Sequence, residues 1–90
     1  MAEIEFDPKK NAINIAKHGI SLERGAEMQV LFARDDRRLD YGEVRILAYG
    51  FIDGLAYCLC YAQRDDVMRA ISLRRVHKKE LVRHGPKTKE

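Results

Sequence analysis

Apolar and polar positions alternate most clearly in the second half of the chain. Two apolar, β-rich runs, Glu43–Ile52 and Leu55–Gln63, are separated by Asp53-Gly54. Asp-Gly between two such runs strongly favours a tight hairpin turn. A second turn, at about residues 64–66, joins the latter run to another alternating segment. The pattern therefore predicts successive antiparallel strands that form a β-meander.

The segment Val67–Glu80 reads as a strand that continues into a short basic helix from about Val76. Because side chains alternate between the two faces of a strand, two sets are expected on opposite faces. One set is Met68, Ala70, Ser72 and Arg74, and the other is Arg69, Ile71 and Leu73. The strand would thus present arginines at fixed positions beside its core residues.

The N-terminal half predicts a short strand at 3–6 and then a helix. Asp7 is a favourable N-cap, Pro8 suits the first helical position, and Gly19 suits the residue after His18. The expected buried face of this helix consists of Ala12, Ile13, Ile15 and Ala16. The opposite side would carry Lys10, Asn14, Lys17 and His18, which recur at helical spacing.

Ser21 is a good cap for a second helix, which is expected to bury a stripe of Leu22, Ala26, Val30 and Ala33. Residues 34–42 form a charged, irregular segment with room for an edge strand. The predicted fold class is α+β, with two N-terminal helices packed on an antiparallel β-meander of about four strands and a short C-terminal helix. Residues 1–84 would form a single domain, and residues 85–90 a disordered basic tail.

Charge is distributed unevenly along the 90 residues, whose net charge is +3. The segment 64–90 contains nine Lys or Arg residues against four acidic residues, while residues 1–63 are slightly acidic. Such local basicity is typical of a protein that binds a phosphate-bearing partner. The N-terminus lacks the pattern of a signal peptide, and no apolar run approaches the roughly 18 residues of a membrane span. The expected location is the cytosol.

The two cysteines, Cys58 and Cys60, share one face of a predicted strand at a separation poorly suited to a disulfide. Two buried thiols in a reducing compartment account for them best. A zinc site that uses both thiols and a histidine is a weaker alternative, because the sequence offers no second ligand pair.

The sequence contains no phosphate-binding loop, dinucleotide motif, zinc-protease motif or serine-hydrolase motif. The histidines and arginines of the chain instead suit a reaction in which the 2′-hydroxyl group of the RNA attacks the neighbouring phosphodiester. This reaction needs neither cofactor nor metal. Guanidinium groups would stabilise the negative charge that develops on the phosphorane oxygens, and a histidine would transfer a proton. The predicted catalytic residues are His18, Arg64, Arg69 and Arg75. The predicted RNA-binding residues are Lys10, Lys17, Arg74, Lys78 and Lys79.

Structural roles compete with these assignments. Arg69 could pair with Glu43 or an aspartate, and Arg74 could simply flank the sheet. His77 and His84 are expected on the surface of the last helix, and Tyr57 and Tyr61 in the core. A non-catalytic basic module that binds nucleic acid or a protein partner is therefore the alternative function.

Three segments together resemble the BrnT toxin family. The first contains Phe6-Asp7, Lys10, Asn14 and Lys17-His18-Gly19-Ile20-Ser21. The second is Asp40-Tyr41-Gly42-Glu43-x-Arg45, and the third is Arg69-x-Ile71-Ser72-x-Arg74-Arg75. The resemblance extends from Phe6 to Glu80.

This resemblance implies a RelE-like ribonuclease toxin of a bacterial type II toxin–antitoxin system, which arrests growth by inhibiting translation. It also implies a BrnA-type antitoxin, a ribbon-helix-helix protein that neutralises the toxin and supplies the contact with operator DNA. The antitoxin is expected to cover the basic face of the sheet, because that would also exclude RNA.

Overall fold

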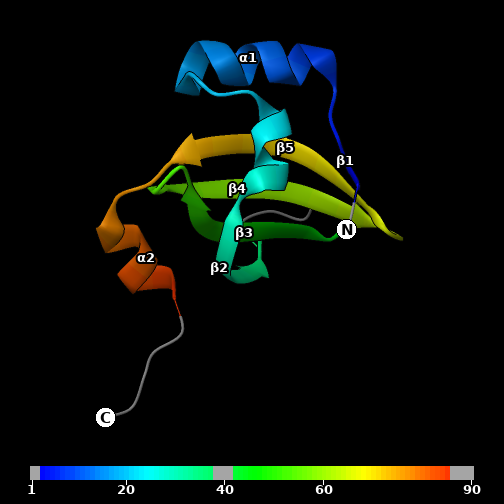
Figure 1. Ribbon diagram of the computed structural model, residues 1–90. Coiled ribbons are helices and arrows are strands. Elements are labelled where there is room, and N and C mark those ends of the chain that lie inside the picture. Colours follow the sequence, from blue (N-terminus) through cyan, green and yellow to red (C-terminus); the bar gives the residue numbers. More distant parts are fainter. Residues whose placement is uncertain (1–2, 38–41, 86–90) are drawn as a thin grey trace.

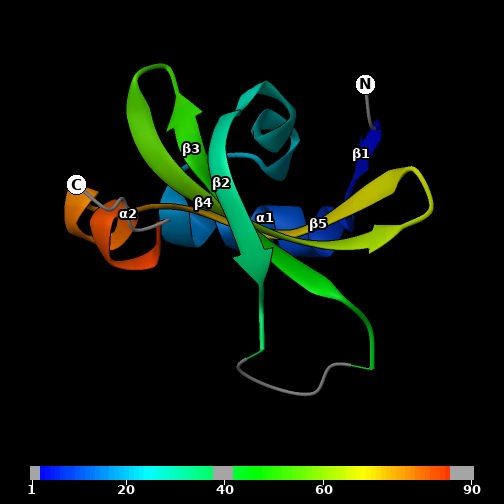
Figure 2. The ribbon, with the colours of Figure 1, turned by 90° about the horizontal axis from the view of Figure 1, so that it is seen from below.

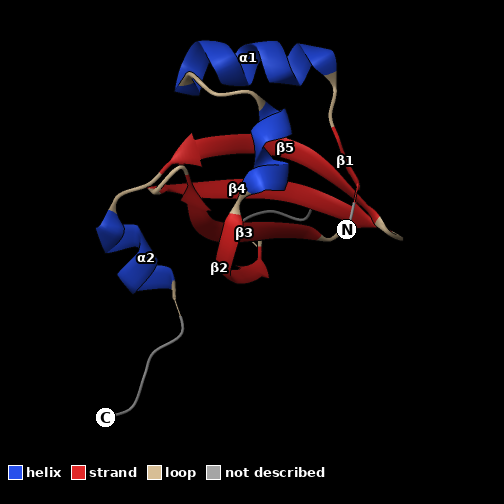
Figure 3. Cartoon of the chain, in the orientation of Figure 1, coloured by secondary structure: helices blue, strands red, loops and turns tan. Residues whose placement is uncertain are grey.

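The computed structural model describes residues 3–37 and 42–85. This part of the chain forms a five-stranded sheet with α1 alongside β5 and α2 beyond the end of that strand (Figure 1, Figure 3). The elements, in chain order, are β1 (Glu3–Glu5), α1 (Pro8–His18), the 3₁₀ helix η1 (Leu22–Glu27), β2 (Gln29–Asp35), β3 (Arg45–Ile52), β4 (Leu55–Arg64), β5 (Val67–Arg75) and α2 (Lys78–His84). No helix among the described residues is both long enough and apolar enough to cross a membrane.

The strand order is β1-β5-β4-β3-β2, and the sheet is mixed. In Figure 2, β1 lies beside β5 and β2 lies beside β3. Strands β3 to β5 pair as the predicted antiparallel meander, and β2 adds an antiparallel strand beside β3, but β1 pairs with β5 in parallel. The predicted turns are confirmed: Asp53 and Gly54 join β3 to β4, and Asp65 and Asp66 join β4 to β5. The α+β class is thus confirmed, whereas the sheet has five strands rather than about four and is not purely antiparallel.

The predicted second helix is wrong. Ser21 does cap a helical segment, since its side chain accepts from the Glu23 backbone N–H, but that segment is the short 3₁₀ helix η1. The chain then becomes extended, and β2 pairs with β3. Val30, which was expected to be buried, is 57% exposed. Val-Leu-Phe at 30–32 favours a strand, and pairing with β3 satisfies backbone groups that a helix would have satisfied internally.

Helix α1 begins and ends as predicted, but the face that it buries is not the predicted one. Asp7 accepts from Lys9 N–H at 2.9 Å, and Gly19 ends the helix in the left-handed conformation with φ 72°. Asn14 is buried, whereas Ile13 and Ile15 are 56% and 47% exposed. The side expected to face solvent is therefore the side that faces the sheet.

The reason lies in the open edge of β5. β1 pairs with β5 only at Val67–Arg69, so it does not reach Leu73. The Asn14 side chain donates to Leu73 C=O at 2.9 Å and accepts from Leu73 N–H at 3.0 Å. It also donates to Ile20 C=O at 2.9 Å. The amide of Asn14 thus takes the place of a neighbouring strand's peptide group, because buried backbone groups need partners.

Apolar side chains pack on both faces of the sheet. The cluster on the η1 side includes Leu22, Tyr57, Leu59 and Leu73, and Tyr61 packs against it. The cluster on the α2 side includes Leu47, Tyr49, Cys58, Cys60 and Val76, with Leu81 of α2 against it. The core positions predicted for the two tyrosines of β4 are confirmed, and both cysteines are buried as thiols. We call the second surface the α2 face.

A β-bulge in β5 changes which residues share a face. Cys60 pairs with Ser72 and Tyr61 pairs with Ala70, so Ile71 is an extra residue. Beyond the bulge the alternation shifts by one position, and Arg69 and Arg74 lie on the same face. The predicted division of this strand, with Arg69 and Arg74 on opposite faces, is therefore wrong. It assumed regular alternation along the whole strand.

Candidate active site

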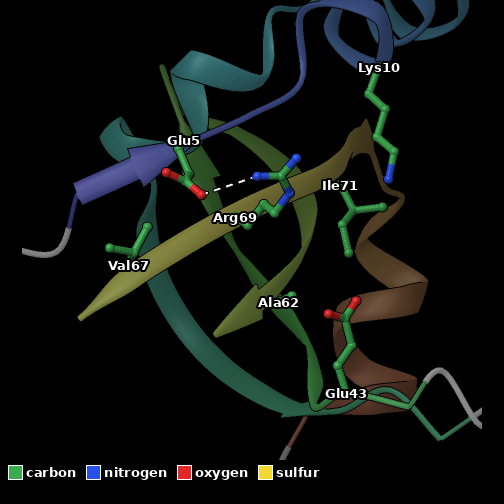
Figure 4. A pocket seen from close by; sticks show the side chains of 7 residues that line it. All are labelled: Glu5, Lys10, Glu43, Ala62, Val67, Arg69 and Ile71. Atoms are coloured by element: carbon green, nitrogen blue, oxygen red, sulfur yellow. Dashed lines mark hydrogen bonds and ion pairs between the residues drawn. The ribbon is translucent and has the colours of Figure 1, made fainter. Parts of the chain in front are cut away.

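Two hollows lie along β5 on the α2 face. The larger has a volume of about 390 Å³, and we call it the Arg69 hollow. Four different parts of the chain contribute charged side chains to it, and small or apolar residues form its floor (Figure 4). Its lining residues are Glu5, Lys10, Glu43, Ala62, Val67, Arg69 and Ile71.

Strand pairing fixes Arg69 at the centre of this hollow. Arg69 lies opposite Ala62 of β4, whose small side chain leaves room above the sheet. It also pairs in register with Glu5 of β1, and the Arg69 Nη1 to Glu5 Oε1 distance is 3.2 Å. Both side chains are about half exposed, so the ion pair is weak and the guanidinium can exchange a carboxylate for a phosphate.

Lys10 and Glu43 enter the hollow from two sides of Arg69 (Figure 4). Lys10 projects from α1, four residues before Asn14, and so lies on the side of the helix that faces β5. Among the described residues it has no ion-pair or hydrogen-bond partner. Glu43 lies just before β3, and Arg45 Nε holds its carboxylate at 3.2 Å.

The second hollow, which we call the Arg74 hollow, has a volume of about 170 Å³. Arg34 Nη1 lies 2.9 Å from His84 Nδ1. Because a guanidinium can only donate, Nδ1 is the acceptor and the ring hydrogen lies on Nε2. Its lining residues are Arg34, Leu47, Tyr49, Cys58, Cys60, Ser72, Arg74 and His84.

The polar groups of the Arg74 hollow hold one another in place. Arg74 makes two hydrogen bonds to Glu80, at 3.1 and 3.3 Å. Burial alone would lower the pKa of Arg74, but the bonds to Glu80 outweigh it and raise that pKa. The same bonds lower the pKa of Glu80. Tyr49 stacks between Phe32 and His84, and burial raises its pKa to about 12, so its hydroxyl keeps its proton.

The structure brings some of the predicted site residues together and separates others. Arg69 and Lys10 line the Arg69 hollow, and Arg74 lines the neighbouring one. Arg75 points to the opposite face, where its guanidinium lies 5.6 Å from the centre of the Tyr57 ring. His18 is the last residue of α1 and is exposed, and it lines neither hollow.

The remaining predicted residues lie elsewhere. Arg64 is the last residue of β4, and its side chain is outside the described part of the chain. Its backbone pairs with Val67, at the opposite end of β5 from Arg75, roughly 23 Å away along the strand. Lys17 is exposed on α1. Lys78 and Lys79 line a shallow basic hollow on α2, together with His77 and Arg83.

The sequence also contained site residues that we did not predict. Glu43 belongs to the Tyr-Gly-Glu-x-Arg segment of the resemblance, which is the signal that could have identified it. Arg34 was hidden because its segment was expected to be irregular. His84 was expected on the surface, but it is half buried against Tyr49. Tertiary contacts alone reveal the last two.

The zinc alternative finds no support among the described residues. Within residues 3–37 and 42–85, no three His, Cys, Asp or Glu side chains are arranged so that they could hold a metal ion. Cys58 and Cys60 line the Arg74 hollow, but His84 there is engaged by Arg34 and stacked on Tyr49.

Comparison with known proteins gives one family. No curated protein matches the chain. A family model described as the ribonuclease toxin BrnT of type II toxin–antitoxin systems matches residues 6–80. The match includes Lys10, Glu43 and Arg69, and ends before His84. Since it covers most of the 90 residues, the chain belongs to the BrnT family of ribonuclease toxins of type II toxin–antitoxin systems.

Proposed function

We propose that this protein is an endoribonuclease that cleaves RNA in the Arg69 hollow by metal-independent acid–base chemistry and thereby inhibits translation. The observation that carries the proposal is the arrangement of three charged side chains. Lys10 and Glu43 enter the hollow from two sides of the Arg69 guanidinium (Figure 4). A phosphodiester bound to Arg69 would therefore have a cation and a carboxylate on different sides.

This arrangement suits in-line attack by the ribose 2′-oxygen, in which the attacking and leaving oxygens lie on opposite sides of phosphorus. The 2′-hydroxyl transfers its proton to the Glu43 carboxylate while its oxygen bonds to phosphorus. The bond from phosphorus to the 5′-oxygen breaks, and that oxygen takes a proton from the Lys10 ammonium group. The products are a 2′,3′-cyclic phosphate and a free 5′-hydroxyl, so water is not consumed in this step.

Arg69 supplies the electrostatic part of the catalysis. Negative charge accumulates on the phosphorane oxygens in the transition state, and a guanidinium fixed on a strand stabilises that charge more than it stabilises the substrate. The Glu5 carboxylate holds Arg69 in position before RNA binds. Its half-exposed ion pair costs little to replace by a phosphate.

The Arg74 hollow would bind the adjoining part of the RNA strand. It lies on the same face as Arg69, five residues further along β5, which corresponds to four residues of β4 because of the bulge and so to roughly 13 Å. Arg34, Arg74 and His84 would contact phosphates and bases there. Lys17, Lys78 and Lys79 remain predicted RNA contacts, and His18, Arg64 and Arg75 remain the competing catalytic assignment.

Cleavage of RNA in EDTA by purified variants tests this proposal. Glu43→Gln, Lys10→Met and Arg69→Ala should each lower the rate by about 10²–10⁴-fold, because each removes a group that acts in the transition state. Lys9→Met is the matched control for Lys10→Met, since Lys9 is an exposed lysine on the same helix that lines neither hollow. We expect it and His18→Ala to stay within about threefold of the unaltered protein.

Two results would contradict the proposal. If His18→Ala abolishes cleavage and Glu43→Gln does not, the reaction takes place at the competing set of residues. If the unaltered protein binds RNA but never cleaves it, the alternative of a non-catalytic basic module is correct. Products that end in a 2′,3′-cyclic phosphate, identified by mass spectrometry, would support attack by the 2′-oxygen.

We further propose that the partner is a BrnA-type ribbon-helix-helix antitoxin and that the toxin acts in the cytoplasm, with operator DNA bound through the antitoxin. The family membership supports an antitoxin in general terms. Induction of the toxin alone should arrest growth, and co-expression of the short reading frame beside its gene should restore it. Growth arrest that this neighbour does not relieve would contradict the assignment of the partner.

A further inference from the structure

Helix α1 turns its apolar side toward solvent. Ala12, Ile13, Ile15 and Ala16 are all exposed, and we call these four residues the outer face of α1. They are neighbours on the helix surface, because their spacings are three and four residues. The two alanines lie in the middle of this surface, with an isoleucine on either side. Small residues between larger ones allow another helix to approach closely.

The exposure of this apolar surface does not result from a poorly formed helix. The same four residues are those that the apolar pattern predicts to be buried, and α1 is well capped at both ends. The monomer uses the opposite side, since Asn14 is committed to Leu73 and Ile20. Burial of an isoleucine side chain stabilises a structure in proportion to the apolar area that it removes from water. The outer face therefore offers substantial unused stabilisation to a partner.

The charge on α1 indicates the chemistry of that partner. The helix carries Lys9, Lys10, Lys17 and His18, and it contains no acidic residue. Lys9 lies beside Ala12 and Ile13 on the helix surface. Basic residues around an aliphatic surface fit a protein segment with apolar side chains flanked by Asp or Glu. RNA would satisfy the lysines but would leave the isoleucines without a suitable contact.

We propose that the outer face of α1 is an anchoring site for the antitoxin, which places an acidic amphipathic helix against it. This inference rests on the antitoxin partner that family membership implies, and not on the catalytic assignment. An 11-residue helix is about 16 Å long, so α1 alone cannot supply a standard interface of roughly 1,600 Å². The antitoxin must extend further. Since Lys10 of the same helix lines the Arg69 hollow, an extension past Lys10 would cover that hollow.

Isothermal titration calorimetry with the antitoxin encoded beside the toxin gene tests the site. The double variant Ile13→Glu/Ile15→Glu should weaken binding by at least about 100-fold, because it buries charge where apolar contacts form and repels acidic residues. Val30→Glu is the matched control. The exposed fraction of Val30, 57%, is similar to that of Ile13, but Val30 lies on β2 at the other edge of the sheet. It should bind within about threefold of the unaltered protein.

RNA cleavage by the double variant should be unchanged, so loss of antitoxin binding and failure of the proposed catalysis are distinguished. Hydrogen exchange of the unaltered complex is an independent measurement, in which the amides of α1 should become more protected. Equal affinity of the double variant and the control, or unchanged exchange in α1, would overturn the proposal. So would a homodimer of the toxin alone that Ile13→Glu dissociates, because the occupant would then be a second copy.

Discussion

Asn14 shows how one side chain can decide which side of a helix faces the sheet. An amide is the side-chain equivalent of a peptide group, with a donor and an acceptor at nearly the same spacing. At position 14 it serves Leu73 N–H and C=O at once, beyond the part of β5 with which β1 pairs. Leaving these buried backbone groups unpaired would cost more than exposing two isoleucines, because exposed apolar side chains are common at protein surfaces.

Asn14→Ala should therefore destabilise the protein by about 3 kcal/mol, since it leaves three backbone groups without partners. Unfolding in urea, followed by circular dichroism, measures the change. Asn11→Ala is the control on the same helix. Asn11 accepts from Leu22 N–H and from the Ser21 hydroxyl at a less buried position, so its loss should cost about 1 kcal/mol. Equal effects of the two substitutions would refute the role assigned to Asn14.

Helix α2 is held to the sheet by weak interactions, so its packing should depend on solution conditions. It is seven residues long, begins without a side-chain cap, and has no fully buried residue. Leu81 packs against the α2-face cluster, and Glu80 pairs with Arg74. The helix carries His84 to the Arg74 hollow, so its attachment decides whether Arg34 and His84 meet.

The Arg74–Glu80 pair makes this attachment dependent on pH. The folded protein lowers the pKa of Glu80 below its ordinary value of 4.5, so the pair stabilises α2 above that pH. The stabilisation is lost as the pH falls through the lower pKa of the folded state. Because both side chains are partly exposed, a coupling of about 0.5 kcal/mol is expected at pH 7.

A double-mutant cycle with Arg74→Met and Glu80→Gln, measured by thermal unfolding at pH 7 and near pH 3, tests this expectation. Arg24 and Glu27 form a comparable exposed pair on η1 and provide a reference cycle remote from α2. A coupling between Arg74 and Glu80 that persists unchanged at the lower pH would contradict an electrostatic attachment.

In the whole molecule, the two faces of the sheet have different roles. One face packs against η1, and α1 lies along the edge of the sheet at β5. The α2 face keeps two hollows with arginines on their walls. The net charge of +3 is modest, so binding of RNA depends on how these cations are placed rather than on overall charge.

Salt dependence of RNA binding measures how many of these cations contact phosphates. If Lys10, Arg69 and Arg74 each neutralise one phosphate, log K against log salt should have a slope of about −2 for single-stranded RNA. Affinity would then fall roughly 20-fold between 50 and 200 mM salt. Fluorescence anisotropy with a 2′-O-methylated RNA, which cannot be cleaved, provides the measurement.

Arg74→Ala should reduce that slope by about 0.7, because one phosphate contact is lost. Arg24→Ala is the control, since Arg24 is an exposed arginine paired with Glu27 and Asp53 on η1. An unchanged slope for Arg74→Ala, or an equal reduction for Arg24→Ala, would exclude the Arg74 hollow from the RNA-binding surface.

Local signals in the sequence determined the strands β3 to β5, both hairpin turns, and the limits of α1. Alternation, turn residues and helix caps act over a few residues, so they hold whatever lies around them. They also placed Arg69 on a strand and Lys10 on a helix. The three segments that resemble the BrnT family were sufficient to identify that family, because they are read directly from residue types and their spacing.

Only the tertiary structure decided which faces those elements present. A single bulge at Ile71 brought Arg69 and Arg74 to one side of β5, and the unfilled edge at Leu73 turned Asn14 inward. The edge of β3 converted an expected helix into β2, which carries Arg34 to His84. Each outcome depends on backbone groups far apart in the chain finding partners, and local patterns contain no information about such pairs.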